Sequence, residues 1–255
     1  MLLEIKELSK QFGGLLAVSD LNITVDRGEI VGLLGPNGAG KTTTFNLVTG
    51  IHKPTRGTVL FDGEDLTGKK PHVIAKRGIG RTFQLASLFP DFTVLENVVA
   101  SFYLHPKCGF VEAVFNTAAY RRKEKDILDQ AHEILQLVGL EHVTNELAGN
   151  LPHGYQKILG VARALAIRPK LLLLDEPIAG MTHDEIEFSL KAFAKMHDQG
   201  ISMLLVEHNM EIMRLCHRIF VITFGRNIAE GTPEAVRQNE DVIKAYFGEG
   251  ECFLS

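Results

Sequence analysis

The sequence has 255 residues, of which 45% are apolar and 23% charged, as expected for a globular protein with a substantial core. Lysine and arginine number 27 against 31 aspartate and glutamate, and the net charge of −4 argues against a nucleic acid as partner. No apolar run approaches the ~18 residues that a membrane-spanning helix needs, and the first residues, MLLEIKELSK, lack a signal-peptide pattern.

The N-terminal part of the chain shows two kinds of strand. Residues 1 to about 30, together with GTVLFDGEDL at 57–66, alternate apolar and polar side chains and predict an antiparallel β layer. In contrast, residues 30–34 are an apolar run that is too short for a helix and ends at Gly35, which predicts a buried strand. The segment KTTTFNLVTG that follows predicts a helix ending at Gly50.

The loop between that strand and that helix, GPNGAGKT, fits G-x-x-x-x-G-K-[ST] at every fixed position. A glycine-rich turn can point successive backbone N–H groups at one spot, and the helix that follows adds the positive end of its dipole. Lys41 adds a full positive charge, and the hydroxyl of Thr42 can ligate Mg²⁺. The lysine, the hydroxyl and the strand–helix context together favour a phosphate site over a chance glycine turn. The residues predicted to form it are Gly35, Pro36, Asn37, Gly38, Ala39, Gly40, Lys41, Thr42 and Thr43.

The chain changes character at about residue 86, where we predict an inserted helical subdomain that extends to residue 156. Within it, AAYRRKEKDILDQAHEILQLVGL carries an apolar stripe at helical spacing. Residues 1–85 and 157–235 are predicted to form the α/β core, and residues 236–255 a C-terminal helix and tail. The segment GTPEAVRQ predicts a helix start with Thr232 as its cap and Pro233 at its first position.

Two further apolar segments end in polar side chains. PKLLLLDEP, residues 169–177, predicts a buried parallel strand with Asp175 at its carboxyl end, where open α/β sheets bind their ligands. Asp175 is placed to hold Mg²⁺, and the next residue, Glu176, to orient and deprotonate a water molecule. GISMLLVEHNM, residues 200–210, repeats this design and ends near His208, which can donate to a phosphate oxygen. A surface acid pair and an ordinary surface histidine are the alternatives.

These motifs, in this order, resemble the ATP-binding subunits of ABC transporters over nearly the whole chain. The resemblance implies an α/β P-loop NTPase with a RecA-like core, an antiparallel β subdomain and an inserted helical subdomain, with ATP and Mg²⁺ as ligands. It also implies that Phe12 stacks on adenine, that Gln84 lies near Mg²⁺ and the attacking water, and that His208 contacts the γ-phosphate. Residues 35–43 match Walker A; Asp175 and Glu176 match Walker B and the catalytic glutamate.

Two motifs depart from the pattern of this family. Where the family writes LSGGQ, this chain has Leu151, Pro152, His153, Gly154 and Tyr155. This signature segment faces the ATP of the opposite subunit in the family. Since Pro152 has neither a hydroxyl nor an N–H group, we expect anion recognition to rest on backbone N–H groups and the helix dipole; a structural role of Pro152 at a helix start stays open. Thr182 replaces an aspartate that often links the two ATP sites, so we expect a shorter hydroxyl contact or less side-chain contact between them.

Longer segments resemble the ATPase of branched-chain amino acid importers, notably RTFQLASLFPDFTVLENV and EGTPEAVRQNEDVIKAYFGEG. The likeness implies a second ABC ATPase subunit, identical or related, and two membrane permease subunits as partners. It implies, indirectly, a periplasmic or extracellular substrate-binding protein. We expect the chain to lie peripherally on the cytoplasmic face of the membrane. Other cargoes, such as urea or an exported lipid, and a soluble ABC ATPase without a transport role remain alternatives. Four residues either line the groove that receives a helix of the permease or belong to the core: Leu88, Phe89, Phe92 and Leu95.

Overall fold

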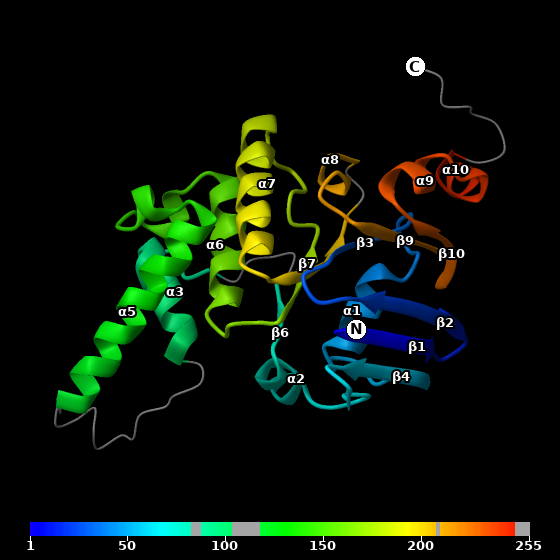
Figure 1. Cartoon of the computed structure of the whole chain (residues 1–255), viewed down its shortest axis with the longest axis horizontal. Coiled ribbons are helices and arrows are strands. Elements are labelled where there is room, and N and C mark those ends of the chain that lie inside the picture. Colours follow the sequence, from blue (N-terminus) through cyan, green and yellow to red (C-terminus); the bar gives the residue numbers. More distant parts are fainter. Residues whose placement is uncertain (83–87, 104–117, 208–209, 248–255) are drawn as a thin grey trace.

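The computed structural model describes residues 1–82, 88–103, 118–207 and 210–247, in which two β-sheets lie beside a group of helices (Figure 1). The predicted α/β fold with an antiparallel layer and a helical insertion is confirmed. In this part of the chain, no helix combines the length and the apolar character that crossing a bilayer requires.

The antiparallel layer consists of β1 (Leu3–Phe12), β2 (Leu15–Val25), β4 (Arg56–Phe61) and β5 (Glu64–Asp65). Its strand order is β2-β1-β4-β5, and every pair is antiparallel. The alternation read from the sequence appears in β1, where Leu3 and Ile5 are buried and the residues after each are more exposed. One face of this sheet therefore contributes to the core.

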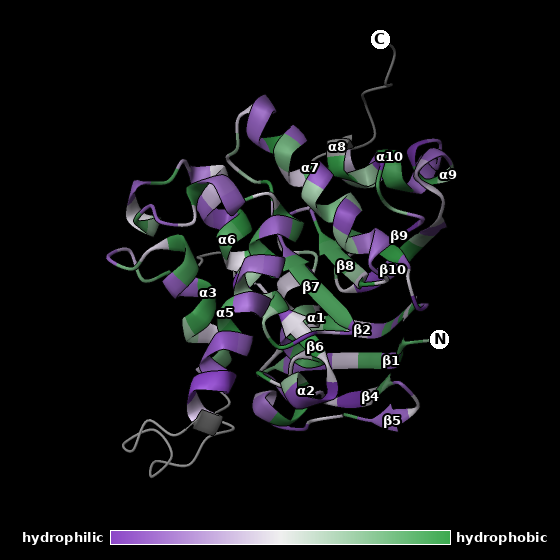
Figure 2. Ribbon diagram, turned by 60° about the vertical axis from the view of Figure 1, so that its left-hand side comes forward, coloured by the Kyte–Doolittle hydropathy of each residue, from purple (hydrophilic) through white to green (hydrophobic). Residues whose placement is uncertain are grey.

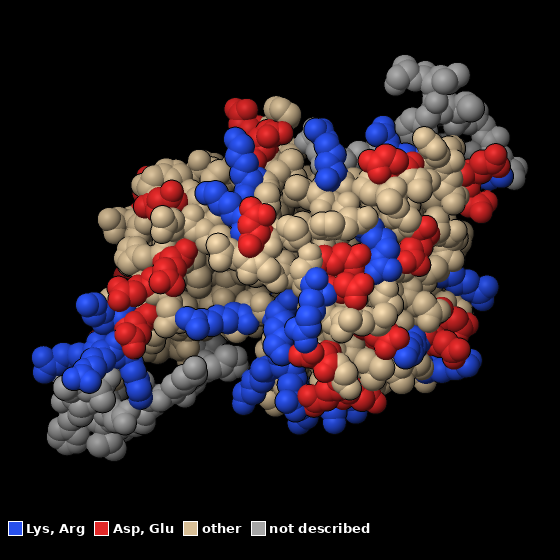
Figure 3. Space-filling view, viewed as in Figure 1, with Lys and Arg blue, Asp and Glu red and all other residues tan. Residues whose placement is uncertain are grey.

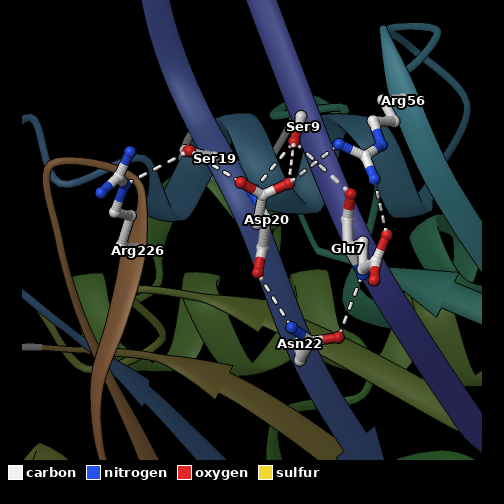
Figure 4. A network of polar contacts seen from close by, with 7 residues as sticks. All are labelled: Glu7, Ser9, Ser19, Asp20, Asn22, Arg56 and Arg226. Atoms are coloured by element: carbon white, nitrogen blue, oxygen red, sulfur yellow. Dashed lines mark hydrogen bonds and ion pairs between the residues drawn. The ribbon is translucent and has the colours of Figure 1, made fainter.

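A network of polar contacts connects this sheet to the hairpin that ends the second sheet (Figure 4). Arg226, at the start of β10 (Arg226–Gly231), donates from Nε to Ser19 Oγ over 3.3 Å, and Arg56 donates to Glu7 Oε2 over 3.0 Å. Asn22 on β2 also exchanges hydrogen bonds with Asn227. The contact of Arg56 lies within the antiparallel layer, whereas those of Arg226 and Asn227 hold the start of β10 against it.

The second sheet has the order β10-β9-β3-β8-β7-β6, and all its pairs except β10 with β9 are parallel. Its three central strands are buried along their whole length, which explains why they read as continuous apolar runs. Because they are parallel, their carboxyl ends lie along one edge of the sheet. The strands are β3 (Ile30–Leu34), β6 (Ile79–Arg81), β7 (Leu171–Asp175), β8 (Ser202–Val206) and β9 (Arg218–Thr223).

One group of helices lies beside the sheets, on the left in Figure 1. Those of the insertion, α3, α5 and α6, pack on one another, and α7 packs against α5 and α6. Residue 156, where we placed the end of the helical subdomain, lies within α6. The predicted cap is confirmed, since Thr232 Oγ1 accepts from the N–H of Ala235 over 3.3 Å. The helices are α1 (Lys41–Val48), α2 (Pro71–Arg77), α3 (Val94–Tyr103), α5 (Ala118–Val138), α6 (His153–Leu165), α7 (His183–Asp198), α8 (Met210–Met213), α9 (Pro233–Arg237) and α10 (Glu240–Phe247), with the 3₁₀ turns Glu141–Val143 and Ala148–Asn150.

Strand β7 lies between two hydrophobic cores. Leu171 and Leu173 belong to the core shared with the antiparallel layer, and Leu172 and Leu174 to the core shared with the helices. Figure 2 shows these central strands as the most apolar part of the fold, beneath helices with polar outer faces. On the face in Figure 3, acidic and basic side chains are mixed, in line with ion pairs such as that of Arg218 with Glu29.

Shortening a buried side chain on either face of β7 should destabilise the whole fold. Leu173→Ala and Leu174→Ala each remove a fully buried side chain, and we expect each to lower the free energy of unfolding by about 2–5 kcal/mol in urea denaturation. Leu128→Ala is the matched control, because Leu128 on α5 is 42% exposed, and should cost less than about 1 kcal/mol. If one β7 variant lost as little free energy of unfolding as the control, the core on that face of the strand would not depend on β7.

Candidate functional site

The glycine-rich loop runs from Gly35 to Gly40 between β3 and α1, as predicted. Gly40 has φ +103°, and a Cβ atom there would lie 2.7 Å from the backbone oxygen of Ala17. A Cβ atom at Gly35 would lie 2.2 Å from the backbone oxygen of Ile222. Glycine is therefore required at both ends of the loop, because backbone from β2 and from β9 approaches where a side chain would stand.

Lys41 lies at the N-terminus of α1 and turns its side chain back onto the loop. Its Nζ atom donates to the backbone oxygens of Gly35 over 2.6 Å and of Pro36 over 3.0 Å. Burial lowers the pKa of this lysine, and the carboxylates of Glu176 and Asp175 oppose that shift. A buried ammonium group beside the amides of a helix N-terminus is a strong anion-binding arrangement.

A cavity of about 480 Å³ opens beside this loop. The structure brings Phe12, residues 37–43 and Glu176 together in its wall, as the sequence predicted for one site. Phe12 is 40% exposed, meets His52 edge-on at 5.2 Å between ring centroids, and carries the ammonium of Lys10 over its ring. The ring is thus held from two sides while part of it faces the cavity.

Four residues in this wall were not predicted: Leu15, Leu16, Ala17 and Phe224. Phe224 is 87% exposed and has φ +45°, a conformation that a bulky residue rarely adopts. It occupies the tight turn between β9 and β10, followed by Gly225 with φ +77°. The sequence did show an aromatic residue directly before a glycine, between two strands. Nothing in that segment, however, indicated that it lies near the glycine-rich loop.

Asp175 ends β7, next to the loop, and forms a buried ion pair that the sequence did not suggest. Arg81 on β6 donates from Nη2 to Asp175 Oδ2 over 3.0 Å, with both side chains less than 10% exposed. The same guanidinium donates to Asn46 Oδ1 over 2.7 Å and to Thr49 Oγ1 over 3.2 Å, both after the loop on α1 and its cap. Burial raises the pKa of Asp175, and the hydrogen bond from Arg81 opposes that shift. Arg81 therefore fixes the carboxylate relative to α1.

Glu176 has a constrained backbone. Its φ is +48°, its N–H donates to the oxygen of Val206 over 2.8 Å, and its oxygen accepts from Lys157 Nζ over 2.9 Å. Left-handed conformations of non-glycine residues cost energy and concentrate at functional sites. This backbone turns the Glu176 side chain out of the line of β7 and toward the cavity wall.

The signature segment lies apart from this cavity, at the start of α6, and none of residues 151–155 is among the residues that line it. Pro152 is the N-cap residue of α6 and gives no side-chain hydrogen bond. The N–H of Gly154, one of the backbone groups at this helix start, donates to Glu185 Oε1 over 2.7 Å. Tyr155 stacks on Phe188 with ring centroids 4.7 Å apart, so its ring packs within its own subunit.

Thr182 has a local partner in the structure. Its hydroxyl accepts from the N–H of Glu185 over 3.4 Å, and its own N–H donates to Glu185 Oε2 over 2.9 Å, which forms a capping box at the start of α7. The contact between two ATP sites that we expected of Thr182 stays a prediction. Gln84 and His208 lie outside the described residues.

Of the four residues predicted either to line a groove for a permease helix or to belong to the core, two are exposed and two are partly buried. Phe89 and Phe92 are each 44% exposed, and their ring centroids are 5.1 Å apart. Leu88 and Leu95 are partly buried and pack against the core of the helical group. The two aromatic residues therefore form a surface pair, whereas the two leucines belong to the packing of the helical group.

Comparison with known proteins decides the family. Residues 18–179 match the family described as ABC transporter, and residues 226–252 match that of the branched-chain amino acid ATP-binding cassette transporter. BraF of Pseudomonas aeruginosa, a high-affinity branched-chain amino acid transport ATP-binding protein, is 42% identical over 250 residues, 97% of this chain and 98% of BraF. The chain belongs to the ABC transporter ATP-binding family.

Solved structures of ABC cassettes share this fold. A nucleotide-free ATP-binding cassette superposes with a TM-score of 0.85 at 31% identity, covering 97% of this chain and 99% of the cassette. A dimeric cassette in a post-hydrolysis state with bound ADP and Pi reaches 0.75 at 25% identity, covering 91% and 98%. As a member of the ABC family, the chain binds nucleotide and is an ATPase.

Removing Arg81 should destabilise this ABC cassette, since it leaves a buried carboxylate without its ion-pair partner. For Arg81→Met we expect the free energy of unfolding at pH 7 to fall by about 3–5 kcal/mol in urea denaturation. Arg77→Met, which removes an exposed arginine paired with Glu64, is the control and should cost at most about 1 kcal/mol. Equal losses in the two variants would show that burial of the Arg81 pair does not matter.

Proposed function

We propose that this chain is the ATP-hydrolysing subunit of an importer for branched-chain amino acids and drives transport through membrane permease subunits. The observation that carries the ATPase part is one cavity wall that contains Phe12, the glycine-rich loop and Glu176. The cargo is supported by the likeness to BraF and by the family matched at residues 226–252. The residues that line the cavity do not indicate which cargo is transported, because the ATPase site does not contact the cargo.

Three parts of the cavity wall have a proposed role in binding ATP: Phe12, the glycine-rich loop with Lys41, and Phe224. Phe12 stacks on the adenine, as the part of its ring that faces the cavity allows. The amides of residues 35–43 and the ammonium of Lys41 bind the phosphates, with Lys41 exchanging the loop carbonyls it now contacts for phosphate oxygens. We propose Phe224 as a further contact, since it lines the same cavity.

The residues present suit Mg²⁺, which prefers oxygen ligands and uses few carboxylates beside phosphates. Thr42 would supply a hydroxyl and Asp175 one carboxylate oxygen, with Gln84 as a further ligand. The hydrogen bond from Arg81 leaves the second oxygen, Oδ1, without a hydrogen bond to that arginine. When bound, the ion neutralises charge on the phosphate oxygens.

Glu176 is the proposed base for the attacking water, with Gln84 orienting that water and His208 donating to the γ-phosphate. Phosphoryl transfer needs mostly positioning and charge stabilisation, so a base held on a rigid, left-handed backbone fits the task. Lys41 stabilises the charge that develops on the transferring group.

A second ATPase subunit is needed to complete the site. Residues 151–155 do not line the cavity of their own chain, and a dimeric cassette is among the similar structures. We propose that two subunits pair head to tail, so that the start of α6 in one faces the nucleotide of the other. The exposed pair Phe89 and Phe92 would receive a helix of a permease subunit, at a peripheral position on the membrane, and a substrate-binding protein would deliver the cargo.

Glu176→Gln should separate binding from hydrolysis. The amide keeps the size of the side chain but cannot accept a proton, so we expect the ATP turnover rate to fall at least about 100-fold. The Kd for ATP, measured by fluorescence with a nucleotide analogue, should stay within about twofold. Glu187→Gln, on the exposed face of α7, is the matched control and should hydrolyse ATP normally. Near-normal turnover by Glu176→Gln would remove Glu176 from the role of base.

The cargo is tested in proteoliposomes that contain the chain together with the membrane subunits that co-purify with it. Leucine with its binding protein should stimulate ATP hydrolysis several-fold, and labelled leucine should accumulate inside the vesicles only with ATP. The control replaces the chain by its Glu176→Gln variant, which should support no uptake. Stimulation by urea or by a lipid, without leucine uptake, would refute the proposed cargo and leave the ATPase assignment intact.

A further inference from the structure

Two charged side chains tie the start of α6 to the segment that follows β7. Lys157 on α6 donates from Nζ to the backbone oxygens of Glu176 over 2.9 Å and of Ala179 over 2.7 Å. In the opposite direction, Glu185 on α7 accepts from the N–H of Gly154 over 2.7 Å. Helices α6 and α7 pack side by side here (Figure 1).

The carboxylate of Glu185 serves two helix starts at once. Oε1 accepts from Gly154 at the start of α6, while Oε2 accepts from the N–H of Thr182 over 2.9 Å and its hydroxyl over 3.0 Å. Helix α6 needs this outside acceptor, because Pro152 at its N-cap has no side-chain oxygen to offer. The hydrogen bonds from Thr182 and Gly154 hold the pKa of Glu185 below its usual value, so it is ionised at neutral pH.

The contact also explains the glycine at position 154. A Cβ atom there would lie 2.7 to 2.9 Å from the Cβ, Cγ and Cδ atoms of Glu185. Only glycine lets α7 approach the start of α6 this closely. The glycine of the signature segment thus has an intramolecular reason in this chain, separate from any contact with nucleotide.

The segment from Glu176 to Thr182 is held at both ends by these two side chains. Lys157 binds its first residue through the backbone oxygen, and Glu185 binds its last through the N–H and hydroxyl of Thr182. Burial lowers the pKa of Lys157, and the negative charges of Glu207 and Glu176 oppose that shift. The start of α6 and the backbone of Glu176 are therefore connected through partly buried, charge-assisted hydrogen bonds.

We propose that Lys157 and Glu185 are positioning residues that form a brace, which makes the start of α6 and the backbone of Glu176 move as one unit. The inference rests on the proposed head-to-tail pairing, in which the start of α6 faces the partner's nucleotide. Docking of that nucleotide then sets the orientation of Glu176 in this subunit's own site. The brace thus connects the two ATP sites through backbone contacts. Such a connection matters in this chain, because Thr182 replaces the aspartate that often links the two sites in the family.

The brace is tested by separating turnover from nucleotide binding in the full chain. For Glu185→Ala and for Lys157→Met we expect the turnover number at saturating ATP to fall about tenfold or more. The Kd for ATP should stay within about twofold, because neither residue lines the cavity. Glu185→Gln should recover part of the loss, since its amide oxygen can accept from one of the two helix starts while its NH2 group cannot accept from the other. Glu187→Ala, on the same helix but exposed, should match the wild type.

A double variant and a stability measurement distinguish the brace from a merely structural role. If both residues act through one brace, the loss in Glu185→Ala/Lys157→Met should be clearly smaller than the product of the two single losses. Turnover within twofold of wild type in the single variants, or turnover and affinity falling together in step with the unfolded fraction in urea, would overturn the brace. A wild-type chain that binds no ATP or hydrolyses none would instead overturn the proposed site itself.

Discussion

The parallel pairing of β3, β8 and β7 is the constraint on which the site depends. Leu33 pairs with Val206, and Val206 pairs with Asp175, so the three strands end in register. The loop after β3 and the acids after β7 therefore reach the same edge of the sheet without a long connection. A slip of one position would move the buried carboxylate of Asp175 away from Arg81, and the cost of a buried charge without its partner opposes such a slip.

The buried charged side chains at this edge of the sheet are stabilised by hydrogen bonds and an ion pair. Lys41 lies against two loop carbonyls, and Asp175 lies against Arg81, which also binds Asn46 on α1. The loop helix and the end of β7 are thus connected by an ion pair as well as by the sheet. The same interactions that offset the burial of these charges hold the cavity in shape before a ligand arrives, which reduces the reorganisation that binding requires.

The sequence predicted those parts of the molecule that local chemistry determines. The three buried strands, the glycine-rich loop and the cap at Thr232 each follow from a few neighbouring residues, and each is confirmed. The pair of Arg81 with Asp175 could not be predicted, because 94 positions separate the partners and nothing beside Arg81 marks it as buried. Phe224 was missed for the same reason, since its place in the cavity wall depends on how β10 meets the antiparallel layer.

In the signature segment, the proline at position 152 affects the contacts of the residues that follow it. With Pro152 at the N-cap, α6 lacks a side-chain acceptor of its own, and the carboxylate of Glu185 takes that place from α7. The N–H of Gly154 cannot serve Glu185 and an incoming phosphate equally, so an anion at this helix start must rely on the remaining free amides and the dipole. Tyr155, in turn, gains a stacking partner in Phe188 and anchors α6 to α7. Gly154 and Tyr155 therefore both join the start of α6 to α7, through Glu185 and Phe188, and this part of the signature segment makes its side-chain contacts within its own chain.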